Sequence, residues 1–349
     1  MSQRARPRGG DARTFTIDAG PTARPVRVLL TGATGFLGSW VAEGFAALGD
    51  HVTTFSGRLL AEPSAGTARA LRTATTEADV VCHLAAATPT QPGPPGDLAY
   101  AHSNVRATRL LLDAVAATSR CHIVFASTAL ITGLGEAWTR PASKRVAYAE
   151  SKLDAEHLVE QYSSHADSGI SLRFHALCGP RSQPDRGVVA AALRAAHENL
   201  PFPIYGKGTS SRDYLHVLDA ACATISAAHQ PTAHYRAIEI GSGQLNTIEA
   251  VVTAAERVTR RRVRRRYLPC RADFDQRTAC DLRAAREALG WTPTRSQLTT
   301  IVRDQWAEQQ TPGTFATQLV WDIDAAGRPS TVILPHGDRV ATRRSGGRQ

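Results

Sequence analysis

A tyrosine and a lysine four residues apart are the first side chains in this sequence that can do chemistry together. A helix would place Tyr148 and Lys152 on one face, one turn apart. Only 3 of the 41 lysine and arginine residues are lysines, so Lys152 stands out in a chain that otherwise uses arginine.

An ammonium group beside a phenol stabilises the phenolate, and lowering a tyrosine pKa from about 10 to about 7 takes roughly 4 kcal/mol. Such a tyrosine can exchange a proton with a sugar or alcohol oxygen near neutral pH. The pair alone leaves a second interpretation open, in which both side chains lie on the solvated face of a surface helix.

A glycine-rich turn upstream gives this pair a context. Residues 26–30 form a short apolar run that predicts a strand, residues 31–38 read TGATGFLG, and a helical pattern follows. Glycines at intervals of three residues permit a tight turn and let the backbone approach a pyrophosphate at the helix N-terminus. The order of strand, glycine turn and helix predicts a dinucleotide-binding unit.

The end of the second predicted strand bears on the choice of cofactor. Folds that prefer NAD usually place a carboxylate there, on the ribose hydroxyls. Residues 51–55 are instead followed by Ser56, Gly57 and Arg58, and an arginine can pair with a 2′-phosphate. The sequence favours NADP(H), with NAD(H) as the alternative, unless Arg58 is a solvated loop residue.

Strands and helices alternate up to the helix of Tyr148. Residues 79–86 read DVVCHLAA and predict a buried strand that ends in small residues, against which a cofactor can lie. A helix with Asn104 near its start follows, and the strand at residues 123–128 ends in Ser127 and Thr128. This order predicts an α/β fold with a doubly wound parallel sheet.

Composition narrows the function classes. The 349 residues suffice for one large or two ordinary domains. The formal charge is +10, and seven arginines lie within residues 257–266, but their alternation predicts a solvated face with only Val263 and Tyr267 turned inward. No nucleic-acid partner is therefore expected.

The six cysteines form no C-x-x-C pair, so neither a metal site nor a redox pair is expected. The sequence shows neither a secretory signal nor an apolar run long enough to span a membrane. These observations predict a cytoplasmic protein with no membrane partner.

Together these motifs resemble those of an extended short-chain dehydrogenase/reductase of the NAD-dependent epimerase/dehydratase type. The resemblance covers about residues 26–308 and includes the glycine turn, the DVVCHLAA strand, and the Tyr148 and Lys152 pair. It also includes the segments LRFHALCGPR at residues 172–181 and RDYLHV at residues 212–217. It implies a Rossmann domain with a smaller C-terminal α/β substrate lobe.

The resemblance also implies roles for individual residues. Tyr148 would be the general acid/base, Lys152 would hold the nicotinamide ribose and lower the pKa of the phenol, and the Thr128 hydroxyl would hydrogen-bond the reacting oxygen. The residues expected to bind the cofactor are Gly32, Thr34, Gly35, Phe36, Leu37, Gly38, Ser56, Arg58, Leu84, Ala85, Ala86, Asn104 and Lys152.

The substrate implied by the resemblance is a nucleotide sugar. Thr128 and Tyr148 would contact it at the reacting carbon, and Arg212 and Arg271 would contact its diphosphate. The alternative for Arg212 is an internal pair with Asp213 or Asp219.

Departures from the family pattern guide the choice of reaction. Ala129 and Leu130 stand where sugar 4,6-dehydratases present an Asp-Glu pair, so dehydration is not expected. Ala176 replaces an asparagine that many relatives carry near the substrate phosphates, and Thr132-Gly133 replaces the common Tyr-Gly.

The turn at Arg58 and short strings at residues 185–190 and 272–274 favour reduction of a (d)TDP-4-keto-6-deoxyhexose at C4, in secondary-metabolite sugar biosynthesis. A nucleotide-sugar 4-epimerase with retained NAD is the alternative, and a decarboxylase acting on a uronic acid is a third activity. A cofactor-binding regulator or nucleic-acid binder is a more distant possibility.

The expected domain organisation follows the same resemblance. Residues 1–24 are expected to be a flexible tail, residues 25–180 the dinucleotide-binding domain with 237–255 returning to it, and residues 181–310 the substrate lobe. Residues 311–349 would form an extension with a hairpin and a disordered end. A homodimer is expected through helices at about 103–118 and 149–163.

Overall fold

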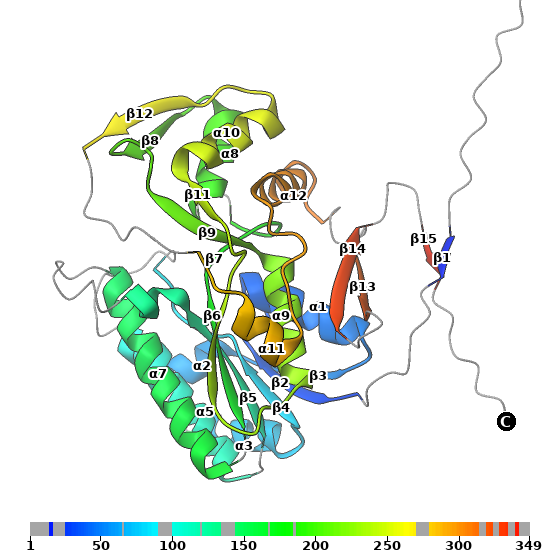
Figure 1. Cartoon of the computed structure of the whole chain (residues 1–349). Coiled ribbons are helices and arrows are strands. Elements are labelled where there is room, and N and C mark those ends of the chain that lie inside the picture. The colour runs from blue at the N-terminus through cyan, green and yellow to red at the C-terminus, as the bar shows by residue number, and fades with distance from the viewer. Residues whose placement is uncertain are drawn as a thin grey trace, which may run out of the picture.

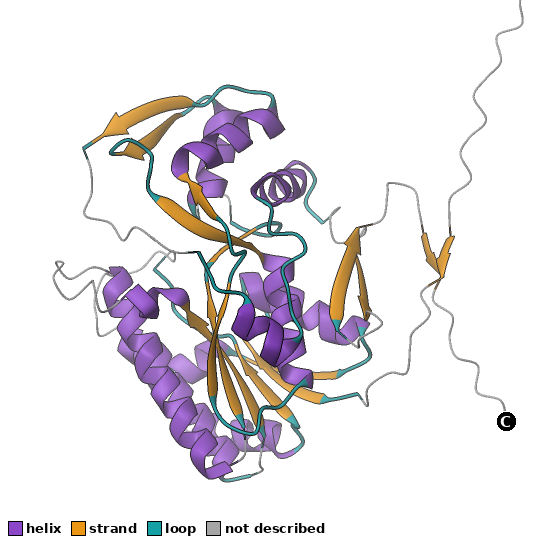
Figure 2. Cartoon of the chain, viewed as in Figure 1, coloured by secondary structure: helices purple, strands orange, loops and turns teal. Residues whose placement is uncertain are grey.

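A parallel six-stranded sheet with helices on both faces forms the larger of two lobes (Figures 1 and 2). The computed structural model describes residues 14–16, 25–64, 66–89, 100–118, 121–133, 144–166, 168–183, 186–269, 279–313, 319–323, 328–333 and 339–341. The strands, in their order across the sheet, are β10 (Arg236–Ile240), β6 (Gly169–Phe174), β5 (His122–Thr128), β4 (Val80–His83), β2 (Arg27–Thr31) and β3 (His51–Phe55). The predicted doubly wound sheet is confirmed.

The central strand β2 is apolar on both sides because helices cover both faces of the sheet. Val28 and Leu30 face one core, beneath helices α1 (Phe36–Ala47) and α9 (Val217–His229). Leu29 faces the other core, which the helices of the opposite layer cover. Those helices are α2 (Gly57–Ala61), α3 (Thr67–Thr76), α5 (Ala107–Ala116) and α7 (Lys144–Ala166).

The strand order reverses beside β2. The chain passes from β2 outward to β3 and then returns to the other side of β2 to form β4. The carboxyl ends of β2 and β4 therefore flank the switch point at which open α/β sheets bind ligands. Short helices η1 (Ala101–Arg106) and η2 (Ala129–Gly133) follow β4 and β5 on this side.

The smaller lobe lies beyond this edge of the sheet (Figure 1). Its helices, α8 (Val188–Glu198), α10 (Ile248–Thr259) and α12 (Leu298–Gln310), share an apolar core with its strands. Those strands are β7 (Ala176–Cys178), β9 (Ser211–His216) and β11 (Leu245–Thr247) in one sheet, and β8 (Pro201–Tyr205) and β12 (Arg264–Leu268) in another.

The chain returns to the larger lobe earlier than the sequence indicates. Helix α9 packs against α1, β10 joins the main sheet beside β6, and α11 (Arg283–Leu289) contacts both α9 and β10. Helix α10, which the expected return segment 237–255 includes in part, packs instead against α8 and α12. The two lobes therefore interleave, and α9 and α11 belong with the dinucleotide-binding core.

Strands β13 (Leu319–Ile323) and β14 (Pro329–Ile333) form the antiparallel pair predicted for the C-terminal extension. Leu319 and Trp321 pack against the core beneath α1 and α9, and Trp321 lies where a Cβ on Gly44 would clash with it. A further short pair joins β1 (Thr14–Thr16) to β15 (Arg339–Ala341). The remaining residues of the expected tail and terminal segment lie outside the described residues.

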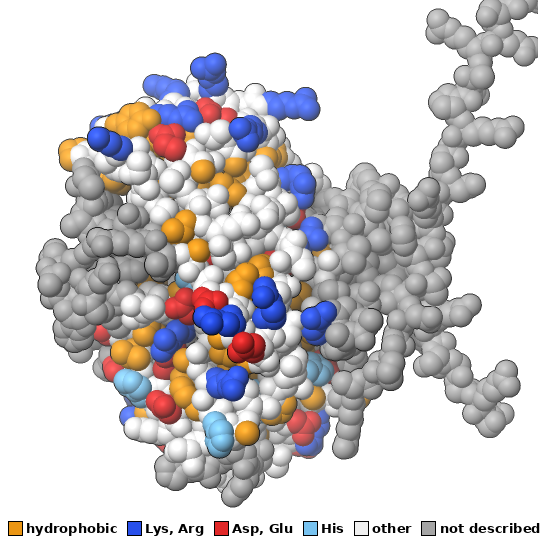
Figure 3. Space-filling view, viewed as in Figure 1, with side chains coloured by type: hydrophobic (Ala, Val, Ile, Leu, Met, Phe, Trp, Pro, Cys, Tyr) orange, Lys and Arg blue, Asp and Glu red, His pale blue; other side chains and the backbone are white. Residues whose placement is uncertain are grey.

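The arginine-rich run falls at the end of α10 and in β12, on the smaller lobe. Basic side chains there are interspersed with acidic ones (Figure 3). Arg265 pairs with Glu249 and Glu256 at 3.1 and 2.9 Å. Val263 is buried as predicted, but the prediction for Tyr267 is wrong, because its side chain is 57% exposed and its hydroxyl donates to Glu249.

In the described part of the chain, no helix is long and apolar enough to cross a membrane.

Candidate functional site

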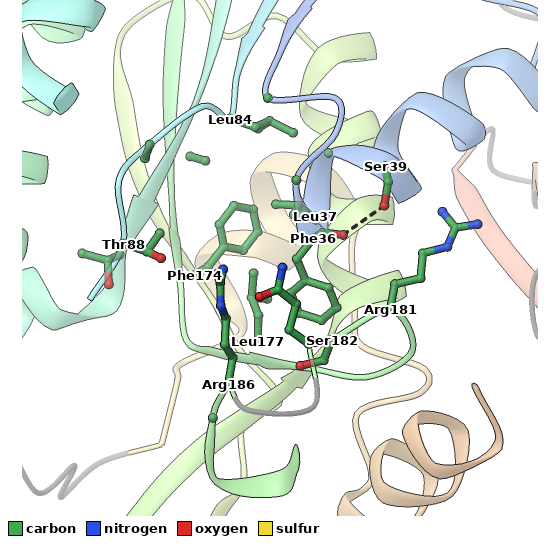
Figure 4. A pocket seen from close by; sticks show the side chains of 18 of the residues that line it. Phe36, Leu37, Ser39, Leu84, Thr88, Phe174, Leu177, Arg181, Ser182 and Arg186 are labelled. Atoms are coloured by element: carbon green, nitrogen blue, oxygen red, sulfur yellow. Dashed lines mark hydrogen bonds between the residues drawn. The ribbon is translucent and has the colours of Figure 1, made fainter. Parts of the chain in front are cut away.

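A cavity of about 960 Å³ opens at the switch point of the sheet, between the glycine turn and the loop that enters the smaller lobe (Figure 4). Eleven of the residues singled out from the sequence line this one cavity: Gly32, Thr34, Gly35, Phe36, Leu37, Gly38, Leu84, Ala86, Thr128, Tyr148 and Lys152. The fold therefore brings the expected cofactor turn and the expected catalytic residues together.

The glycine turn forms a backbone cradle in which Gly32 and Gly38 leave no room for a Cβ. Gly32 has a φ of +78°, and a Cβ there would lie 2.7 Å from the Ala85 nitrogen. A Cβ on Gly38 would collide with the carbonyl oxygen of Gly32. At the start of α1, Gly35 provides no side-chain cap, so the amide groups of the first helical turn remain available to an anion. These features fit the diphosphate of a dinucleotide.

A chain of hydrogen bonds through His83 fixes the end of β4 against this cradle. The Ala85 amide donates to Thr31 Oγ1 at 3.3 Å, and this hydroxyl lies 2.7 Å from His83 Nδ1. His83 Nε2 lies 3.0 Å from Thr108 Oγ1, and that hydroxyl donates to the Asn104 carbonyl at 2.7 Å.

The direction of this chain sets the tautomer of His83. Because the Thr108 hydroxyl donates to a carbonyl, it accepts from Nε2–H of His83, and Nδ1 accepts from Thr31. Burial lowers the pKa of His83 to about 3, with the Lys152 charge acting in the same direction. The imidazole is therefore neutral and holds the small residues after β4 in place.

Asn104 links the same segment to the helix of the Tyr148 and Lys152 pair. Its amide oxygen accepts from the Ala87 nitrogen at 2.8 Å, and its amide nitrogen donates to Ser151 Oγ at 3.0 Å. Ser151 in turn donates to the Tyr148 carbonyl at 2.8 Å. Asn104 does not line the cavity, so its place in the structure is one of positioning.

Lys152 lies almost wholly inside the protein, with 1% of its surface exposed. Its Nζ lies 4.0 Å from the centroid of the Phe125 ring. Burial lowers the pKa of Lys152 to about 7, and the nearby Glu156 carboxylate opposes this shift. Glu156 is itself paired with Arg173 at 2.7 Å. Burial therefore makes the charged form of Lys152 less stable than it would be in water.

Tyr148 packs edge-on against Tyr100, with the ring centroids 5.8 Å apart. Burial raises the pKa of Tyr148, and Tyr100 adds to the effect. This direction is opposite to the one expected from the lysine at i+4. In the protein alone, desolvation of the phenolate outweighs the ammonium one turn away, so the phenol is protonated at neutral pH.

Thr128 ends β5, opposite Phe174 of β6, and its Oγ1 accepts from the Leu130 amide at 3.3 Å. The segment that follows it is anchored by Thr132, whose hydroxyl donates to Glu239. Glu239 also lies 3.1 Å from His175 Nε2, and His175 lines the cavity. The pKa of the Glu239 carboxyl is lowered, chiefly by the hydrogen bond from His175, so this carboxylate holds the wall beside Thr128.

Some expected site residues do not line the cavity. Ser56 and Arg58 lie beyond its lining, and Ala85 contacts the glycine turn from behind. Arg212 donates to the Ser211 carbonyl at 2.6 Å and to Ser210 Oγ at 3.3 Å. Arg271 lies outside the described residues.

Asp213 and Asp219, the alternative partners of Arg212, both accept hydrogen bonds from loops. Asp213 instead accepts from the Ser242 amide at 2.6 Å and the Cys280 amide at 3.1 Å. Asp219 accepts from the backbone or hydroxyl groups of residues 294–296. Both carboxylates therefore hold loops in place.

Sequence reasoning missed four residues at the entrance to the smaller lobe that line the cavity: His175, Arg181, Gln183 and Arg186. Two segments of the sequence pattern contain three of these residues, since residues 172–181 include His175 and Arg181 and residues 185–190 include Arg186, but the pattern gave them no role. Arg181 stacks on Trp40, 3.7 Å from the ring centroid, and pairs with Glu43 at 2.6 Å. It thereby joins the loop to helix α1.

Comparison with known proteins agrees with this geometry. The sequence model of the NAD dependent epimerase/dehydratase family matches residues 28–241. The UDP-glucose 4-epimerase of Streptomyces lividans is 27% identical over 316 residues, covering 80% of this chain and 95% of that protein. The UDP-glucose 4-epimerase of Corynebacterium glutamicum is 29% identical over 228 residues, covering 60% of this chain and 69% of that protein.

A solved structure of MoeE5 in complex with UDP-glucose and NAD matches with a TM-score of 0.69 and 27% identity. The match covers 81% of this chain and 99% of MoeE5. A second structure of MoeE5, in complex with UDP-glucuronic acid and NAD, matches with a TM-score of 0.70 and the same 27% identity.

Proposed function

Because the chain belongs to the NAD-dependent epimerase/dehydratase family, we propose that it is a nucleotide-sugar 4-epimerase that works with a retained NAD. The observation that carries this proposal is the position of Thr128, Tyr148 and Lys152 in one cavity with the glycine cradle. Support for epimerisation over reduction comes from relatives named UDP-glucose 4-epimerase, one of which is covered to 95% of its length.

The sequence preference for a 4-ketoreductase rests on weaker ground. Its main support is the turn at Ser56 and Arg58, and neither residue lines the cavity. The short strings that favour reduction fall largely at residues 185–190 and 272–274, and the second of these lies outside the described residues. We therefore place epimerisation first and reduction second.

The residues of the chain would divide the work as follows. Tyr148 takes the proton from the C4 hydroxyl and later returns it, while Thr128 hydrogen-bonds the same oxygen and fixes its direction. Lys152 binds the ribose hydroxyls of the cofactor and supplies the positive charge that a phenolate needs. A bound NAD supplies the acceptance and return of a hydride at C4.

The pKa shifts of Tyr148 and Lys152 determine when these residues could play their proposed roles. Burial raises the pKa of Tyr148 and lowers that of Lys152 to about 7. A proton is therefore held more firmly by the phenol than by the amine in the protein alone. Substrate and cofactor must reverse this order before Tyr148 can act as a base, which would confine proton abstraction to the loaded site.

Retained NAD is the cofactor we propose, because the MoeE5 structures that match this chain contain it. One observation keeps NADP as a second candidate. In the described part of the chain, the Arg58 side chain forms neither a hydrogen bond nor an ion pair, and it follows the strand end at which a 2′-phosphate would lie. Identification of the dinucleotide released from the denatured protein separates the two.

A homodimer through the neighbouring helices α5 and α7 stays part of this proposal. The two helices contact one another and lie together on the outside of the sheet (Figure 1). Light scattering coupled to gel filtration would test it, and a monomeric mass would count against it.

Turnover distinguishes the two candidate reactions. The purified protein should convert UDP-glucose into its C4 epimer without a net change in nicotinamide absorbance. Stoichiometric consumption of NADPH with a TDP-4-keto-6-deoxyhexose, and no epimer from UDP-glucose, would instead establish the reductase.

A further inference from the structure

Among the described residues, the Arg186 guanidinium in the cavity has no hydrogen-bonding partner, whereas Lys152 and Arg181 each contact another side chain. The described lining residues include three Lys or Arg side chains, Lys152, Arg181 and Arg186, and no Asp or Glu. Lys152 lies against the Phe125 ring, and Arg181 is paired with Glu43. Among the described residues, none accepts a hydrogen bond from the Arg186 guanidinium, and its Nε is buried.

A buried guanidinium donor without an acceptor is costly. Leaving such a group unmatched destabilises the folded protein, because its hydration is lost without replacement. Arg186 is partly exposed to the cavity, so solvent can reach part of the side chain but not Nε. An arginine presents its donors as a planar fork, which is matched by two oxygens of one carboxylate or phosphate.

The place of Arg186 indicates which part of a ligand would meet it. Figure 4 shows its side chain pointing toward Phe174, whereas Arg181 points away, toward helix α1. Phe174 is the partner of Thr128 across β5 and β6, so Arg186 is directed to the catalytic end of the cavity. The glycine cradle, where the cofactor diphosphate would lie, is formed by a different segment, between β2 and α1.

From these observations we propose that Arg186 binds an oxyanion of the nucleotide sugar at the catalytic end of the cavity. This proposal rests on the proposed function and deepens it by naming a class of substrate. The position beside Phe174 favours a carboxylate carried by the hexose, and the sugar diphosphate is the other source of the same chemistry. Arg186 would then select an acidic sugar nucleotide over a neutral one.

Binding measurements can separate these sources. Titration calorimetry of the protein as purified would use UDP, UDP-glucose and UDP-glucuronic acid as ligands. The variants are Arg186→Gln, which removes the charge and the fork, and Arg186→Lys, which keeps the charge alone. Arg194→Gln is the matched control, because Arg194 is an exposed arginine on the helix that follows.

The wild-type protein should bind UDP-glucuronic acid more tightly than UDP-glucose, and Arg186→Gln should weaken UDP-glucuronic acid alone by about 10- to 100-fold. Arg186→Lys should recover only part of that affinity, and Arg194→Gln should change nothing. An equal loss for all three ligands would assign the diphosphate as the bound oxyanion. Unchanged affinity of Arg186→Gln for all three would overturn the proposal.

The same experiments also distinguish failure of the proposed reaction from failure of the proposed role of Arg186. If the wild-type protein binds none of the three ligands, both the nucleotide-sugar function and the role of Arg186 are refuted. If binding depends on Arg186 but no C4 epimer forms, the oxyanion site stands and only the proposed reaction is wrong.

Discussion

The neutral imidazole of His83 makes the larger lobe sensitive to acid. In the folded chain its pKa is about 3, because the ring is buried and the Lys152 charge acts in the same direction. In the unfolded chain an ordinary histidine takes up a proton near pH 6.5. The folded state is therefore fully favoured above about pH 6.5 and loses stability as the pH falls from there toward 3.

The magnitude follows from the two pKa values. At pH 5 the unfolded chain has bound the proton and the folded chain has not, which lowers the free energy of unfolding by about 2 kcal/mol relative to pH 7. A folded protein has only about 5–15 kcal/mol of stability in total, so this loss is measurable.

Urea unfolding at pH 7 and pH 5 provides the assay. The wild type should lose about 2 kcal/mol more than His83→Gln between the two pH values, because other titrating groups are common to both proteins. His157→Gln is the control, since His157 is exposed on α7 and should lose as much as the wild type. Equal losses in the wild type and His83→Gln would refute the assignment of a buried neutral histidine.

Three further substitutions test the site and its supports. Gly38→Ala should abolish retention of the dinucleotide, because the new Cβ would collide with the Gly32 carbonyl, whereas Gly66→Ala has open space around its Cβ and should retain it. Absorbance of the purified variants reports this, and a Gly38→Ala protein that keeps its cofactor would contradict the cradle. Asp219→Asn should lower the free energy of unfolding by about 3 kcal/mol, since its carboxylate accepts from the Thr294 and Arg295 amides, and a loss below about 1 kcal/mol in urea would count against it. Tyr148→Phe should reduce kcat by about 10²- to 10⁴-fold with little change in substrate affinity, and near-normal turnover would remove Tyr148 from the acid/base role.

The larger lobe was largely predictable because its signals are local. The apolar run at β2, the glycine turn and the helix of α1 follow each other directly, so their order alone indicates the dinucleotide unit. The presence of Thr128 at a strand end and of Tyr148 and Lys152 on one helix could be predicted for the same reason.

Other features could not be predicted, because they depend on contacts between distant segments. Asn104 stands at the position of a cofactor ligand in the sequence pattern, but its hydrogen bonds to Ala87 and Ser151 make it a link between two segments. The interaction of Glu239 with Thr132 and His175 joins strand β10 to helix η2 and to the residue that follows β6. No spacing rule reveals such a cluster.

The electrostatics of the catalytic pair show the same limit. Spacing alone predicts a lysine that lowers the pKa of a tyrosine, because only the charge is considered. The fold adds desolvation, which raises the pKa of Tyr148 and lowers that of Lys152. The balance between charge and burial depends on packing around both groups, and packing is a property of the folded chain.

The most direct test of 4-epimerisation follows an isotope at the reacting carbon. The purified protein, without added cofactor, would be incubated with UDP-glucose and, separately, with UDP-glucuronic acid, each deuterated at C4, and the products would be examined by mass spectrometry and NMR. The proposed reaction predicts a C4 epimer that retains the deuterium at C4, with no loss to solvent. Formation of no epimer from either substrate, or of an epimer that has exchanged its C4 deuterium with solvent, would contradict it.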